Sequence, residues 1–94
     1  MNIHEVYKLL LLTTPKDAKV HLEEEVITIH VIEYYKDTRY PIVHNILITK
    51  HNEGLIAFTS YNIDPLPEWF TAIFNIKKVY ARGLYYIEPK EPNE

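Results

Sequence analysis

The chain has 94 residues, 47% of them apolar, no cysteine and a formal charge of −3. Without cysteine, a disulfide framework, a thiolate nucleophile and a Cys-based zinc site are all excluded. The acidic balance argues against a general polyanion-binding protein, which needs an excess of Lys and Arg on one surface.

The length and composition predict a single α+β domain over residues 1–88, followed by a flexible C-terminal tail at 89–94. The tail is expected because its residues are charged or proline and carry too little apolar surface to fold. The segment from Met1 to Pro15 holds only a four-leucine run, typical of neither a signal peptide nor a membrane span. We therefore expect no membrane association and a cytoplasmic location, in the host cytoplasm if the protein is viral.

The first predicted element is an amphipathic helix over residues 3–13. Asn2, followed three residues later by Glu5, fits a capping box. The apolar residues that follow recur at the spacing of one helical face: Ile3, Val6, Tyr7, Leu10 and Leu11. Pro15 ends this helix because proline disfavours the helical conformation of the residue before it. A short extra strand is expected near 19–22.

Three antiparallel strands are predicted between Val26 and Ile63, at 26–35, 40–50 and 55–62, because their residues are β-branched and aromatic. Polar turns at 36–39 and 51–54 separate them. If Tyr35 faces Tyr40, Val31 pairs with His44 and Ile32 with Val43, and both faces of the sheet are largely apolar. Something must therefore cover each face.

The segment after the meander is predicted to form a second amphipathic helix and a last strand. Asp64 and Pro65 form a typical helix start, and the spacing of Leu66, Trp69, Phe70, Ile73 and Phe74 predicts a helix over 65–76. Residues 79–87 are predicted to be a strand with a bulge or close approach at Gly83. The predicted fold class is thus α+β: an antiparallel three-strand meander plus a C-terminal strand with two helices packed on the sheet, in the order α-β-β-β-α-β.

The two helices can cover the sheet in two ways. They can lie on opposite faces, or together on one face, as small α+β domains usually do. The second arrangement is slightly preferred. It leaves an apolar patch uncovered, and the residues of this patch are the candidates for protein contact: Ile32, Tyr34, Val43, Leu47, Ile56 and Phe58. Which face the helices take stays open.

Motifs for chemistry are lacking. The predicted register places His30, Asn45 and Ser60 in one row, but side chains that rise in parallel from a sheet rarely present a nucleophile to its base. No pair of histidines has the short spacing of a zinc helix. We therefore predict no catalytic, cofactor or metal site and a protein that is not an enzyme.

One stretch interleaves cations with aromatic residues and gives the alternative hypothesis. Its candidate nucleic-acid contacts are Lys77, Lys78, Tyr80, Arg82 and Tyr86. The order of a helix, a three-strand meander and a helix is also that of double-stranded-RNA-binding domains and of some small phage-encoded inhibitors of CRISPR effectors. The second helix lacks the lysine cluster of the RNA-binding domains at its start, so no family is assigned.

In the slightly preferred arrangement, the two predicted helices cover only one of the two apolar faces of the sheet, and the sequence lacks a motif for catalysis. Together these features lead to one main functional hypothesis. The protein is a small non-enzymatic interaction protein that forms a homodimer through a sheet face or edge and binds another protein. One form of this role that we consider is that of an inhibitor encoded by a virus or mobile element. The alternative is a nucleic-acid-binding module that uses the strand at 77–86.

Overall fold

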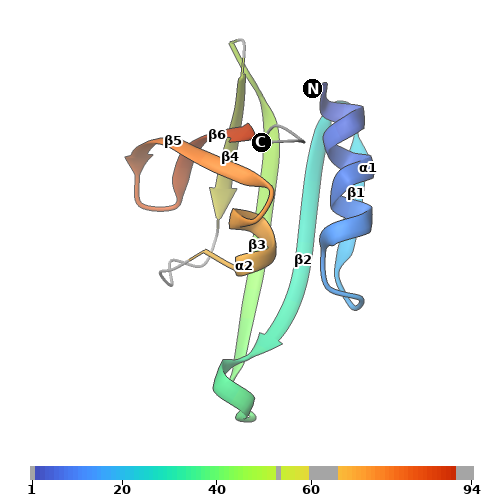
Figure 1. The fold of residues 1–94 in the computed structure, drawn as a ribbon, viewed down its shortest axis with the longest axis vertical. Coiled ribbons are helices and arrows are strands. Elements are labelled where there is room, and N and C mark those ends of the chain that lie inside the picture. Colours follow the sequence, from blue (N-terminus) through green and yellow to red (C-terminus); the bar gives the residue numbers. More distant parts are fainter. Residues whose placement is uncertain (1, 53, 60–65, 91–94) are drawn as a thin grey trace.

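The structure is a computed structural model, which describes residues 2–52, 54–59 and 66–90. Its elements are α1 (Ile3–Thr13), β1 (Lys19–Glu23), β2 (Val26–Tyr34), a 3₁₀ turn (Tyr35–Asp37), β3 (Pro41–His51), β4 (Gly54–Thr59), α2 (Glu68–Thr71), β5 (Phe74–Ala81) and β6 (Leu84–Pro89). Within the described residues one antiparallel six-stranded sheet runs in the order β1-β2-β3-β4-β6-β5 (Figure 1). The α+β class is confirmed, but the predicted order of helices and strands is wrong.

The first helix has the predicted bounds and cap. The Asn2 side chain accepts a hydrogen bond from the Glu5 N–H at 2.9 Å, and the Asn2 N–H donates to Glu5 Oε1 at 3.2 Å. This reciprocal pair satisfies two N–H groups that a helix start otherwise leaves without partners. Leu11, predicted on the apolar face of the helix, is 52% exposed. The short extra strand near 19–22 is confirmed as β1.

The meander has the predicted register. Val31 pairs with His44 and Ile32 with Val43, and Lys50 lies opposite Leu55 on β4. The β2–β3 turn requires left-handed backbone at Lys36 (φ 42°) and Asp37 (φ 59°). The predicted third strand ends at Thr59 within the described residues, and its last part, 60–62, lies outside them.

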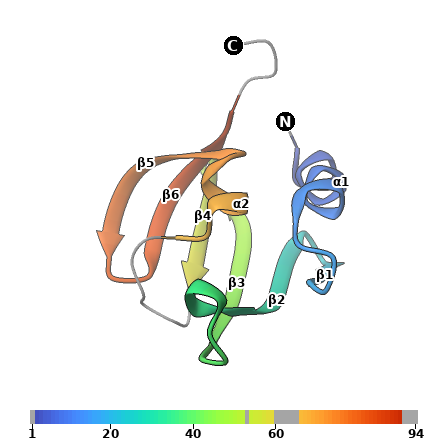
Figure 2. The same cartoon turned by 60° about the horizontal axis from the view of Figure 1, so that its bottom comes forward.

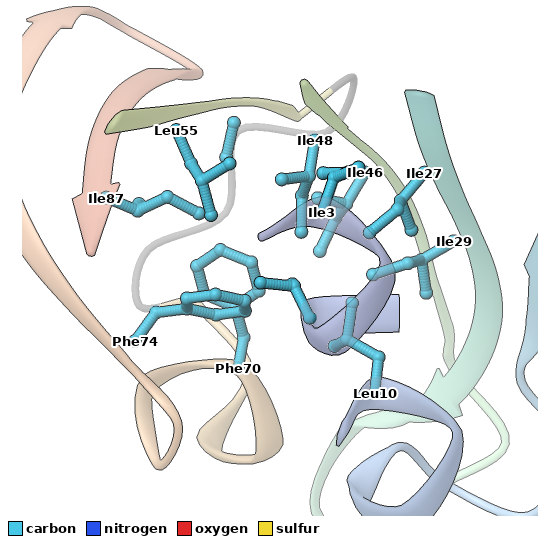
Figure 3. Packing of buried hydrophobic residues seen from close by; sticks show 12 residues of the cluster. Ile3, Leu10, Ile27, Ile29, Ile46, Ile48, Leu55, Phe70, Phe74 and Ile87 are labelled. Carbon is cyan, nitrogen blue, oxygen red and sulfur yellow. The ribbon is translucent and has the colours of Figure 1, made fainter. Parts of the chain in front are cut away.

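Both helices pack on the same face of the sheet, which we call the covered face (Figure 2). Ile27, Ile29, Ile46 and Ile48 from β2 and β3 point into the core that this face forms (Figure 3). They meet apolar side chains from both helices and the adjoining strands: Ile3, Val6, Leu10, Leu55, Ala57, Phe70, Phe74 and Ile87. The slightly preferred arrangement of the helices is therefore the one observed.

The second helix is much shorter than predicted. Of the described residues 66–76, only Glu68–Thr71 is helical, and the Ile73 N–H donates to the Phe70 carbonyl as the turn ends. A single helical turn already brings Phe70 and Phe74 together, with ring centroids 4.8 Å apart, so the helical spacing did not require a longer helix. The predicted helix start at Asp64 and Pro65 lies outside the described residues.

The chain beyond α2 forms a hairpin, and the prediction of one strand over 79–87 is wrong. Phe74–Ala81 forms β5, and Ala81 pairs with Leu84 across the turn. Gly83, predicted as a bulge, lies in this turn with φ 82°, a left-handed conformation that glycine adopts without steric cost. Pro89 is the last residue of β6, and the Lys90 N–H donates to the Ile73 carbonyl at 2.8 Å.

Candidate functional site

The face opposite the helices, which we call the open face, carries the six predicted protein-contact residues. It is formed by alternate residues of the strands: Thr28, His30, Ile32, Tyr34, Val43, Asn45, Leu47, Ile56, Phe58, Leu84 and Tyr86. Ile32 is 47% exposed, Tyr34 61% and Phe58 46%, whereas Val43 and Leu47 are half-buried. Ile56 is only 8% exposed, because β6 lies beside β4 and places Tyr86 directly opposite it. The exposed apolar surface thus centres on β2, β3 and the end of β4.

A shallow hollow of about 450 Å³ lies on the β1 side of this surface. Lys19, Thr28, His30, Asn45 and Phe58 are among the residues that line it. His30 Nδ1 and Asn45 Oδ1 form a hydrogen bond of 2.5 Å, so two members of the predicted polar row do meet. Ser60, the third member, lies outside the described residues. The His30 ring is therefore engaged with an amide, which supplies no nucleophile.

The opposite corner of the open face is aromatic and basic. Tyr80 and Tyr86 stack with ring centroids 6.4 Å apart, and His51 meets both rings edge-on. Lys78 Nζ lies 5.2 Å from the centre of the Tyr80 ring. Tyr86 also covers Gly54, where a Cβ would lie 2.4 Å from its ring, so this glycine makes room for the stack. Three of the predicted nucleic-acid contacts are thus brought together, with their rings packed against one another.

The remaining two candidates for nucleic-acid contact are Lys77 and Arg82. Lys77 forms an exposed ion pair with Glu88 at 3.5 Å. Arg82 lies in the β5–β6 turn. Lys77 and Lys78, which directly follow the helix predicted over 65–76, both lie in β5.

Sequence analysis missed a polar cluster at the end of the covered face. The Trp69 indole N–H donates to Glu33 Oε1 at 2.6 Å, and His44 Nε2 lies 3.7 Å from the same oxygen. This cluster ties α2 to β2 and β3. The one indication of this cluster in the sequence is the β2–β3 register. It pairs Val31 with His44, and Glu33 lies two residues beyond Val31 on the same face.

The pKa of His44 is lower than its ordinary value of 6.5, because burial disfavours the charged ring, while the Glu33 carboxylate partly opposes this effect. The folded protein therefore prefers neutral His44. The contribution of His44 to stability is fully present above pH 6.5 and is lost as the pH falls through the lowered pKa.

We accordingly expect the His44 ring signals to titrate with a midpoint below 6.5 in an NMR pH series of the folded chain. Trp69→Phe removes the hydrogen bond to Glu33 and should move this midpoint. A His44 midpoint at or above 6.5 would contradict the claim that burial of the ring outweighs the opposing effect of the Glu33 carboxylate.

Within the described ranges, no group of three or more His, Asp or Glu residues is placed to hold a metal ion. The same residues contain no helix that is long and apolar enough to cross a membrane. The fold and the site together define a small α+β protein whose sheet has one covered and one open face. No family model, curated protein or solved structure matches the chain.

Proposed function

We propose that this chain is a small non-enzymatic interaction protein that self-associates and uses its open face to bind another protein. The observation that carries the proposal is the exposure of Ile32, Tyr34 and Phe58 on the side of the sheet away from both helices. Large exposed apolar residues grouped on one surface are typical of interaction sites. An inhibitory role in a virus or mobile element is one form of this proposal.

The exposed apolar side chains of the open face support a contact with another protein. The largest apolar patch of a typical monomer covers about 300–600 Å² and is often functional. Burying about 400 Å² at about 25 cal/mol per Å² contributes about 10 kcal/mol before the entropy of association is subtracted. This gross free energy is large enough to sustain a specific complex.

The charges around the open face indicate the chemistry of the partner. Lys19 lines the hollow on one side, and Lys78 lies in the aromatic corner on the other. The chain as a whole is acidic, with carboxylates such as Glu24 and Glu25 concentrated in the β1–β2 turn. Lys19 and Glu23 of β1 and Lys78 of β5 thus border the open face, and its partner is a protein surface with apolar anchors bordered by charges complementary to these.

Site-directed photo-crosslinking tests the open face. With p-benzoylphenylalanine in place of Phe58, we expect a crosslink to a second polypeptide when the chain is expressed in its native cells. An added Ile32→Lys substitution should remove that crosslink, because it places a charge in the same apolar patch. Leu12→Lys should leave it unchanged, because Leu12 is 85% exposed on α1, away from the sheet. A crosslink that survives Ile32→Lys, or none at position 58, would reject the open face as the binding surface.

A nucleic-acid-binding module is the second candidate, and the corner formed by Lys78, Tyr80, Tyr86 and His51 is the observation in its favour. Against it, Tyr80 and Tyr86 already stack on each other, so the ring faces that meet in this stack are not available to a base. If this function holds, fluorescence anisotropy will detect salt-sensitive binding to RNA or DNA that weakens on Lys78→Glu or Arg82→Glu. Our leading proposal predicts no binding to either nucleic acid at low salt.

A further inference from the structure

The two edges of the sheet differ in how well they can accept another strand. At one edge, β5 carries Lys77 and Lys78 and has two shifts in its register with β6. Bulges on an edge strand hinder the addition of a further strand, and so do lysines such as those of β5, which has no acidic residue to pair with them in a second copy. At the other edge, β1 pairs with β2 over all five of its residues without a shift. Among the described residues, no backbone group outside β2 forms a hydrogen bond to β1.

The sequence of β1 is complementary to itself in the antiparallel direction. If two copies of Lys19–Glu23 are aligned about His21, Lys19 of each copy lies opposite Glu23 of the other. In the same alignment Val20 lies opposite Leu22. Both charged pairs then lie on the open-face side and both apolar pairs on the covered side, so these four cross-strand contacts are favourable, and the two His21 side chains lie opposite each other at the centre.

We propose that two copies of this chain pair through β1, antiparallel and centred on His21, and join their six-stranded sheets into one continuous sheet. This inference rests on the proposed function, because it specifies the surface through which the proposed self-association takes place. Val20 and Leu22 are already partly buried against the core beneath α1, so the pairing extends an existing apolar layer. In one copy α1 lies beside β1 (Figure 2), so a two-fold axis perpendicular to the sheet places the second α1 on the same side of the joined sheet.

The exposed charges of β1 are free to form the new contacts. Within one copy, His21 Nε2 lies 3.4 Å from Glu23 Oε2, with the two side chains 70% and 77% exposed. A contact this exposed is weak, and little is lost when Glu23 turns toward a lysine of the second copy. Because the two-fold axis stands perpendicular to the sheet, the two open faces lie side by side. The dimer therefore presents two partner sites in one plane and binds a partner with paired sites more tightly than a monomer does.

A single engineered cysteine tests this geometry, since the chain has none of its own. Across the two-fold axis the His21 Cα atoms would lie about 4.5–5.5 Å apart, within the range that a disulfide spans. Under mild oxidation we expect His21→Cys to become a covalent dimer almost completely. The matched control Lys78→Cys, which places an exposed thiol on the opposite edge strand, should stay largely uncrosslinked.

Exchanging the charges provides a second test that leaves the fold intact, because both side chains are exposed. Lys19→Glu alone should weaken the dimer about tenfold, since it sets like charges opposite each other in both symmetric pairs. Adding Glu23→Lys should restore the affinity of the original chain. If the original chain is a dimer but His21→Cys does not crosslink, or the double exchange does not restore affinity, β1 pairing is overturned and self-association through another surface stands. If the original chain is a monomer, both the pairing through β1 and self-association through any other surface are overturned.

Discussion

Phe70→Ala should lower the free energy of unfolding by about 3–5 kcal/mol, the range for truncating a buried aromatic ring. Phe70 is completely buried, and its ring contacts those of Phe74 and Trp69 at centroid distances of 4.8 and 6.3 Å. It is the main anchor of the four-residue α2, which has too few backbone hydrogen bonds to be stable alone. Because small domains are stable by about 5–15 kcal/mol, this loss should leave the chain close to unfolding.

Urea denaturation followed by the fluorescence of Trp69, the single tryptophan of the chain, measures this effect. Leu12→Ala is the matched control: it also truncates a large apolar side chain, but one that is 85% exposed. We expect its change in unfolding free energy to stay within about 0.5 kcal/mol. Equal losses for the two variants would contradict the position of Phe70 in the core.

Substitutions to lysine at two adjacent positions of β4 should have opposite outcomes. Ala57 is completely buried on the covered face, so Ala57→Lys would place an uncompensated charge in the core and cost more than about 4 kcal/mol. Phe58 is 46% exposed on the open face, so Phe58→Lys should keep the chain folded, with a change within about 1 kcal/mol.

Circular dichroism and thermal unfolding of the two variants distinguish these outcomes. Both positions lie in the same strand, so the two variants place lysine in a nearly matched backbone environment. The difference in stability between the two variants therefore reports which face the helices cover. Loss of the fold in Phe58→Lys together with a folded Ala57→Lys would mean that the covered and open faces have been assigned the wrong way round.

The meander was predictable because two independent signals agreed. The β-branched and aromatic residues after Val26 define strands, and the two polar turns fix how they align, so Val31 could be placed opposite His44 and Ile48 opposite Ala57. The helix cap at Asn2 and Glu5 was equally predictable, because a capping box depends on local spacing alone.

The C-terminal third was not predictable by the same reasoning. The apolar spacing from Trp69 to Phe74 fits a helix, but it also fits one helical turn followed by a strand, and pairing with β6 decides between them. That pairing depends on the turn at Gly83, which looks like a bulge if the strand is taken as continuous. Tertiary pairing here overrides a local pattern.

The candidate site was predicted in part. Register alone placed Ile32, Tyr34 and Phe58 on one face, but it did not determine which face the helices cover. The burial of Ile56 depends on Tyr86 of β6, a neighbour that the sequence did not predict. The cluster of Trp69, Glu33 and His44 joins residues 36 positions apart through a short helix that was predicted as a longer one. Sequence spacing carries no signal for such a contact.

The molar mass of the original chain at low micromolar concentration, measured by light scattering, tests the central claim of self-association most directly. The chain has a mass of 11.2 kDa. We predict about twice this mass, together with a shift toward the single-chain mass in Lys19→Glu and its recovery when Glu23→Lys is added. A mass of 11.2 kDa across the micromolar range would contradict the claim that this protein self-associates.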